Sequence, residues 1–115
     1  WTGVVCGNGH VTKLNLNTRK LQGSIPISFG DLPYLNTLQM SSNCMTGSLP
    51  STIGLLSNLI TLNLNGNQFT GSIPKSVGSL TNALFVALSL NRMTGTMPSS
   101  WESLVFLRDL NVQRN

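Results

Sequence analysis

The chain has 115 residues, of which 40% are apolar and only 9% are charged, against about 25% charged residues in a typical soluble domain. This length suits one domain with a modest core. The formal charge of +4 comes from scattered basic residues, which excludes a continuous nucleic-acid-binding patch. The longest apolar run, Ala83 to Leu88, is far shorter than the roughly 20 residues of a membrane helix, so we expect any membrane anchor to lie outside this chain.

The first ten residues precede any repeated pattern. They contain the segment Gly7-Asn-Gly-His10, with the only histidine of the chain. One histidine does not complete a metal site, and the two glycines lack the third glycine and the following helix of a phosphate-binding loop. We therefore predict no cofactor and no metal, and we interpret His10 as a loop residue.

A repeat of 24 residues begins at Val11. It is marked by asparagine at Asn43, Asn67, Asn91 and Asn115, whose position in the first repeat is held by Arg19. The repeats span residues 11–34, 35–58, 59–82 and 83–106, with a partial fifth repeat at 107–115. Repeats of this length indicate a solenoid, in which each unit buries its apolar face only against its neighbours. We expect this array to be a segment of a longer solenoid.

Apolar residues hold the first, fourth, sixth and eleventh positions of each repeat, as Leu59, Leu62, Leu64 and Phe69 do in the third. With the asparagine, this spacing matches the LxxLxLxxNxL signature of a leucine-rich repeat. The alternation within LxL predicts half-buried strands near residues 13–17, 37–41, 61–65, 85–89 and 109–113. The predicted fold is an α/β-type solenoid: a right-handed coil with a concave parallel sheet and few or only short 3-10 helices on the convex side.

The repeated asparagine stands where the chain turns away from the sheet and leaves buried backbone groups that need partners. An amide side chain donates and accepts hydrogen bonds at once. We therefore predict a structural ladder made of Asn43, Asn67, Asn91 and Asn115. Later in each repeat a proline keeps the same phase, so the stretch Ser72-Ile-Pro74 should be extended and not helical.

A second motif, LxGxIPxxxGxL, occurs from Leu21 to Leu32 and from Phe69 to Leu80. It resembles the plant-type leucine-rich repeats of receptor-like kinase ectodomains, receptor-like proteins and polygalacturonase-inhibiting proteins. The resemblance implies an extracellular or cell-surface location. Repeat four departs from the motif, and its Ser-Ser-Trp101 segment is similar to repeats of trypanosomatid surface antigens.

The opening Trp1-Thr-Gly-Val-Val-Cys6 is similar to the end of the N-terminal cap in those plant proteins. Residues 1–10 are accordingly interpreted as a remnant of that cap, followed by the repeats at 11–115. The resemblance implies that Cys6 is half of a cap disulfide, whose partner cysteine in the family stands two residues before the tryptophan.

The ionisable residues are too far apart for catalysis, which needs converging groups. Asp31 and Glu102 lie about 14 Å apart along the stack, beyond the ~5 to 9.5 Å of a glycosidase pair, and Asp109 lies on the strand face. Cys6 and Cys44 lie about 10 Å apart along the axis, beyond the ~7 Å limit for a disulfide. We predict that the chain is not an enzyme and that Cys44 is an outward-facing thiol on a turn.

Leucine-rich repeats present an extended concave surface on which side chains of successive strands align. We predict that this surface binds a protein, a peptide or a glycan, and neither nucleic acid nor membrane. Repeat four should contribute an apolar hot spot around Phe85. The predicted ligand-binding residues are Lys13, Asn15, Thr37, Gln39, Ile60, Thr61, Asn63, Leu84, Phe85, Ala87, Leu90, Asp109 and Asn111.

Three kinds of function remain open at this stage. The preferred hypothesis is a segment of a receptor ectodomain that signals through parts outside this chain. The second is a secreted enzyme inhibitor of the polygalacturonase-inhibiting type. The third is a protist surface antigen, a structural coat or an ice-binding surface, suggested by the regular Thr, Ser and Asn columns.

Overall fold

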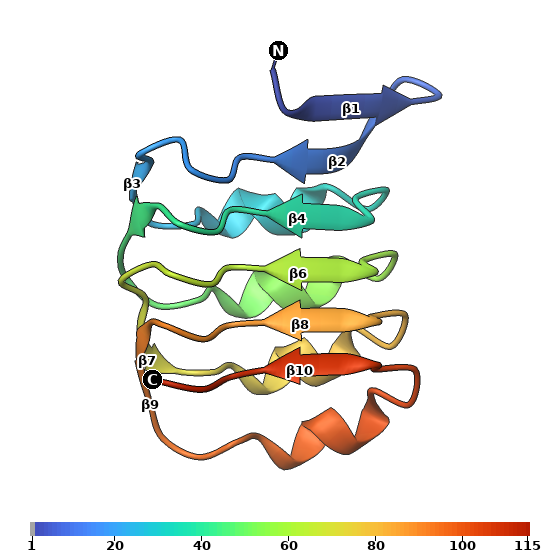
Figure 1. Cartoon of the computed structure of the whole chain (residues 1–115). Coiled ribbons are helices and arrows are strands. Elements are labelled where there is room, and N and C mark those ends of the chain that lie inside the picture. The colour runs from blue at the N-terminus through green and yellow to red at the C-terminus, as the bar shows by residue number, and fades with distance from the viewer. Residues whose placement is uncertain (1) are drawn as a thin grey trace.

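The structure, a computed structural model, describes residues 2–115 and is a short stack of coils with a sheet on one side and short helices on the other (Figure 1). The main sheet has the strand order β1-β2-β4-β6-β8-β10. Its strands are β1 (Val4–Gly7), β2 (His10–Asn15), β4 (Thr37–Gln39), β6 (Thr61–Asn63), β8 (Phe85–Ala87) and β10 (Asp109–Asn111). The predicted repeat solenoid with a parallel sheet is confirmed.

Each residue of a parallel strand pairs with the residue one repeat, or 24 positions, further along the chain. Leu14 pairs with Leu38, Leu38 with Leu62, and Leu62 with Val86, all in parallel strands. Strands β4, β6, β8 and β10 begin where the sequence predicts but end two residues earlier. The backbone bonding between repeats nevertheless continues, since the amide of Ser42 donates to the carbonyl of Asn65 at 2.9 Å. Ser42 has a left-handed backbone, with a φ of 55°, and the chain turns there.

The segment before the first repeat includes a strand, β1. β1 pairs with β2 in the antiparallel sense, with Val4 opposite Leu14 and Gly7 opposite His10. This hairpin adds an antiparallel strand to the edge of the parallel sheet. The interpretation of His10 as a loop residue is therefore wrong: it is the first residue of β2, because its backbone pairs with that of Gly7.

The convex side carries the 3-10 helices η1 (Ile27–Asp31), η2 (Ser51–Leu55), η3 (Lys75–Ser79) and η4 (Ser99–Ser103). Each follows a proline in an extended conformation, such as Pro74 with φ −67° and ψ 141°. A proline ring fixes φ and suits the position before a helical turn. The predicted extended stretch at residues 72–74 is confirmed, since Ser72 ends a strand and Pro74 is extended.

Two further small sheets flank the stack. One pairs β3 (Gln22–Gly23) with β5 (Cys44–Met45), and the other pairs β7 (Thr70–Ser72) with β9 (Arg92–Thr94). These strands were not predicted from the sequence. They correct the placement of Cys44, which lies in β5 and not on a turn because its amide donates to the carbonyl of Leu21 in the repeat before.

The core fills the space between the main sheet and the 3-10 helices. Its central members are completely buried, among them Leu38, Ile53, Leu62 and Phe69. Ala83 takes the first position of repeat four and is equally buried. Alanine is smaller than the valine or leucine at this position of the other repeats, but the solenoid closes around it without a change of phase.

The predicted asparagine ladder is present. In its central rung, Asn67 donates from Nδ2 to the carbonyls of Met40 and Leu64 at 2.9 and 3.1 Å, and its Oδ1 accepts from the amide of Met45 at 3.0 Å. Asn43, Asn91 and Asn115 repeat this pattern. Each amide bonds to its own repeat and to the repeat before it, so the ladder holds neighbouring coils together.

A second polar ladder, which the sequence analysis missed, lies beside the first. Oδ1 of Asn17 accepts hydrogen bonds from the amide and the hydroxyl of Ser41 at 2.7 and 2.9 Å. Asn65 and Ser89 form the same pair at the same distances. Ser89 is only 4% exposed because this pairing draws it inward.

Candidate functional site

The concave sheet aligns most of the predicted ligand-binding residues in two columns. Its register places Lys13, Thr37, Thr61, Phe85 and Asp109 side by side in one column. The other column consists of Asn15, Gln39, Asn63, Ala87 and Asn111. We call these the first and second concave columns. Ile60, Leu84 and Leu90 lie outside them.

The chemistry of the first concave column changes along the stack. A lysine stands at one end, an aspartate at the other, and two threonines and a phenylalanine between them. Phe85 is 43% exposed although its strand, β8, has a neighbouring strand on each side. The second column is made of amides except at Ala87, next to this ring. A partner on this surface would meet an apolar side chain surrounded by hydrogen-bonding groups.

The apolar residues of repeat four do not form the single cluster that the sequence predicted. Leu84 lines a hollow of about 380 Å³ together with Ile60, Phe106, Asn58 and Asn82. Leu90 instead lines a hollow of about 190 Å³ at the other end of the strands, near Arg114. The separation arises because Leu84 precedes β8 and Leu90 follows it. Phe85 and Ala87 alone belong to the centre of the concave face.

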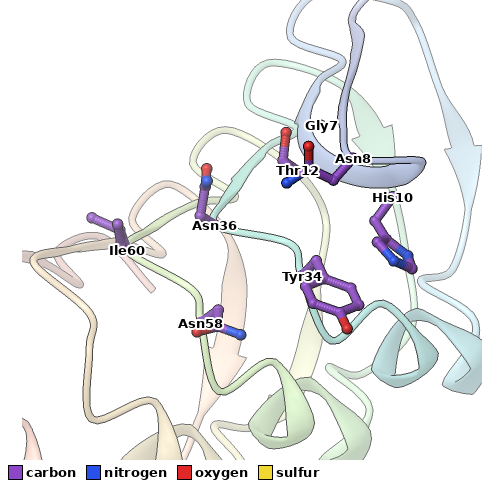
Figure 2. Close-up of a pocket in the computed structure, with 8 residues that line it drawn as sticks. All are labelled: Gly7, Asn8, His10, Thr12, Tyr34, Asn36, Asn58 and Ile60. Carbon is purple, nitrogen blue, oxygen red and sulfur yellow. The ribbon is translucent and has the colours of Figure 1, made fainter.

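A larger hollow, of about 530 Å³, lies beside the first two repeats at the side where the parallel strands begin (Figure 2). We call this side the leading rim. The lining residues are Gly7, Asn8, His10, Thr12, Tyr34, Asn36, Asn58 and Ile60. Asn58 and Ile60 also line the hollow at Leu84, so the two hollows adjoin.

Two aromatic rings meet at the leading rim. The centroids of His10 and Tyr34 are 4.0 Å apart and their planes form an angle of 26°, which is a stacked arrangement. Sequence reasoning missed this pair. The signal was available, because residues 10, 34, 58, 82 and 106 share one phase of the repeat and read His, Tyr, Asn, Asn and Phe.

The ionisable groups lie on separate elements. Asp31 ends η1, Glu102 lies in η4 and Asp109 begins β10, and all three are exposed. Among residues 2–115, no group of three or more His, Cys, Asp or Glu side chains is placed to hold a metal ion. Cys6 and Cys44 are both free thiols on the surface.

Comparison with known proteins identifies the family. Residues 9–69 match the family model described as leucine rich repeat. The chain belongs to the leucine-rich-repeat family. No curated protein matches the sequence of this leucine-rich-repeat chain.

Solved structures show which leucine-rich repeats it resembles. A chain of the BIR3–SERK2 complex from Arabidopsis thaliana superposes with a TM-score of 0.91 at 36% identity, over 96% of this chain and 61% of that one. The PEPR1–AtPEP1 structure gives a TM-score of 0.90 at 32% identity, over 93% of this chain and 15% of that one. A plant ice-binding protein gives 0.89 at 29% identity, over 97% of this chain and 37% of that one. The plant-type resemblance is confirmed, and this chain spans less than two thirds of each of these proteins.

None of the helices among residues 2–115 of this leucine-rich-repeat chain has the length and apolar character needed to cross a bilayer.

Proposed function

We propose that this leucine-rich-repeat chain is a segment of an extracellular plant-type receptor ectodomain, and that its concave columns bind a peptide or protein. The similar structures support this proposal, since they include the BIR3–SERK2 complex and a plant peptide hormone receptor, RGFR1, in complex with RGF2. The extracellular location rests on the same similarity.

The observation that carries the proposal is the exposed ring of Phe85 in the first concave column. The corresponding residues of the neighbouring strands are Thr61 and Asp109, which are polar. Burying a phenylalanine side chain that water now contacts stabilises a complex by roughly 1.5 to 3 kcal/mol. Amides of the second column stand beside it and offer donors and acceptors to a peptide backbone. An apolar anchor within a polar surround is the usual form of a binding hot spot.

The test is to select ligands without knowing the natural partner. A displayed library of random peptides is panned against the whole chain, and the enriched peptides are measured by calorimetry. Replacing Phe85 by Ala should weaken their binding by about 1 to 3 kcal/mol, because Phe85 lies outside the core and the fold persists. Thr61→Ala, in the same column, is the matched control and should change binding by much less.

Two results would count against the proposal. Peptides of full affinity for the Phe85→Ala variant would show that the ring is not an anchor. If panning enriches no peptide that binds the concave face, that face does not bind peptides.

A second function is favoured by the similarity to a plant ice-binding protein. The two small sheets and the residues that follow β3 and β5 carry exposed hydroxyl groups at repeat spacing. The columns are Thr46, Thr70, Thr94 and Ser24, Ser48, Ser72. Neighbouring strands lie about 4.8 Å apart, so such columns present a regular array to water. Thermal hysteresis of a solution of the chain tests this function. Thr70→Lys, at the centre of the array, should abolish any hysteresis, and its absence in the unmodified chain would reject ice binding.

A further inference from the structure

We propose that the leading rim is a binding site for a neutral oligosaccharide, separate from the concave columns and independent of the function proposed for them. The hollow of about 530 Å³ falls in the range of about 300 to 1,000 Å³ that holds small ligands. Its lining includes no carboxylate, lysine or arginine. An uncharged partner with many hydroxyl groups fits this lining better than a charged one.

The stacked rings supply the apolar part of the site. Tyr34 is 51% exposed, and stacking on His10 fixes the orientation of its ring. In Figure 2 the ring stands beside the hollow, with Asn58 and Ile60 on the far side of it. An aromatic ring presents a flat apolar face. The C–H face of a sugar ring is also flat and apolar, so the two surfaces match.

Amides that are already oriented supply the polar part. Asn58 donates from Nδ2 to the carbonyl of Pro33 at 2.8 Å, and Asn82 makes the equivalent bond to Ser57 at the same distance. Among the described residues, Oδ1 of both amides has no hydrogen-bond partner. Asn36 is held in the opposite sense: its Oδ1 accepts from Thr37 at 2.9 Å, which leaves Nδ2 as a donor. A row of fixed donors and acceptors suits adjacent hydroxyl groups, which both donate and accept.

The size of the site favours a chain of sugars over a single one. The second hollow continues from Asn58 and Ile60 to Phe106, which is 61% exposed. Phe106 and Tyr34 share the same phase three repeats apart. Three strand spacings correspond to about 14 Å, so the rim offers one aromatic surface at each end and amides between them.

The experiment is a titration of the isotope-labelled whole chain, followed by amide signals in nuclear magnetic resonance. The probes are cellohexaose, xylohexaose and chitohexaose, with hexagalacturonate as an acidic comparison and a neutral peptide of Gly, Ser and Thr. At least one neutral hexasaccharide should shift the signals of Tyr34, Asn58 and Asn82 and leave that of Ala87, which lies in the second concave column and lines neither hollow, unchanged. The acidic sugar and the peptide should shift none of them.

Variants locate the site. Tyr34→Ala should weaken binding by about tenfold, because it removes the principal stacking surface. Phe106→Ala should weaken it too, whereas Val105→Ala should not, since Val105 is 74% exposed and does not line either hollow. His10→Ala provides a second test if the Tyr34 variant melts earlier than the parent chain.

Several outcomes would overturn the proposal. They are no shift with any of the three neutral sugars, shifts centred on Ala87, unchanged affinity in both the Tyr34 and the His10 variants, or binding of the peptide or the acidic sugar at the same signals. None of these outcomes bears on peptide binding by the concave columns.

Discussion

At the scale of single residues, this protein is held together by side chains that bond across repeats. Asn67 is only 7% exposed and bonds to the backbone of two successive coils. The partners of its amide are buried backbone groups that water does not reach, and each such group left without a partner costs about 1 to 3 kcal/mol. The repeated asparagine is therefore the polar counterpart of the leucine core.

We expect Asn67→Ala to lower the free energy of unfolding by roughly 3 kcal/mol, because it leaves the amide of Met45 without a partner. The carbonyls of Met40 and Leu64 each lose one of two hydrogen bonds and keep the one from Asn43 or Asn91. Urea unfolding followed by circular dichroism measures the change. Asn111→Ala is the control, since Asn111 is exposed on the concave face, and it should alter stability by less than about 0.5 kcal/mol. Equal unfolding midpoints for the two variants would contradict the ladder's role.

Leu90 has a left-handed backbone, with a φ of 56°, at the position where the preceding repeat has Gly66 with a φ of 66°. The left-handed region costs an ordinary L-residue roughly 1 to 2 kcal/mol, whereas asparagine tolerates it. Leu90 is half exposed, so its replacement removes little core packing. We expect Leu90→Asn to raise the unfolding free energy by about 0.5 to 1 kcal/mol.

The reverse change serves as its control. Gly66→Leu should destabilise the chain by about 1 kcal/mol through the backbone alone, because an added Cβ at Gly66 has its nearest contact at 3.6 Å and meets no clash. Thermal melts of both variants give the comparison. A loss of stability in Leu90→Asn would show that the exposed leucine contributes packing that outweighs its backbone strain.

At the scale of elements, the convex 3-10 helices stack closely because a glycine recurs in them. A Cβ added at Gly54 would meet the backbone oxygen of Ser76 in η3 and its Cβ, the latter at 2.7 Å. Gly78 stands in the same relation to Ser100 in η4. A hydroxyl bond reinforces this stacking, as Ser100 donates to the carbonyl of Lys75 at 2.7 Å. The spacing of the helices, and with it the curvature of the sheet, depends on these small residues.

We expect Gly54→Ala to destabilise the chain by roughly 1 to 3 kcal/mol, since the methyl group forces η2 and η3 apart. Glu102 occupies the same position of the repeat in η4 and is exposed, so Glu102→Ala is the control for the helix itself. Differential scanning calorimetry of both variants separates the effects. If the Gly54→Ala variant has the same melting temperature as the parent chain, the helices have room to move apart at no cost.

At the scale of the whole molecule, each coil contacts only the coils beside it, so burial depends on position in the stack. Leu62 is completely buried in the third repeat, whereas Leu110, at the same position of the fifth, is 40% exposed. A solenoid's stability is approximately a sum over repeats and their interfaces. The same substitution at equivalent positions of two repeats should therefore change the free energy of unfolding by different amounts.

We expect Leu62→Ala to cost about 2 to 5 kcal/mol, as in other fully buried sites, and Leu110→Ala about 1 kcal/mol or less. Chemical denaturation of the two variants tests this difference directly, with the same chemical change in each. Similar losses would show that the last strand is as well packed as the third.

The sequence by itself determined the repeat, the phase of each coil, the start of every parallel strand after the first and the residues of the asparagine ladder. These features follow from local periodicity: LxL can bury one face only as a strand, and an amide at the turn has both functions that the buried backbone needs. The alignment of Lys13, Thr37 and Phe85 in one column also follows, because parallel strands one repeat apart must pair in register.

Only the tertiary structure decided the contacts between residues that the strand pattern does not pair. The antiparallel hairpin of β1, the inward pairing of Ser89 with Asn65 and the stacking of His10 on Tyr34 all depend on how neighbouring coils pack. Periodicity places two residues next to each other, but the orientation of their side chains depends on contacts with the adjacent coils. The stacked rings of the leading rim were therefore not predicted, although the 24-residue phase that His10, Tyr34 and Asn58 share is visible in the sequence.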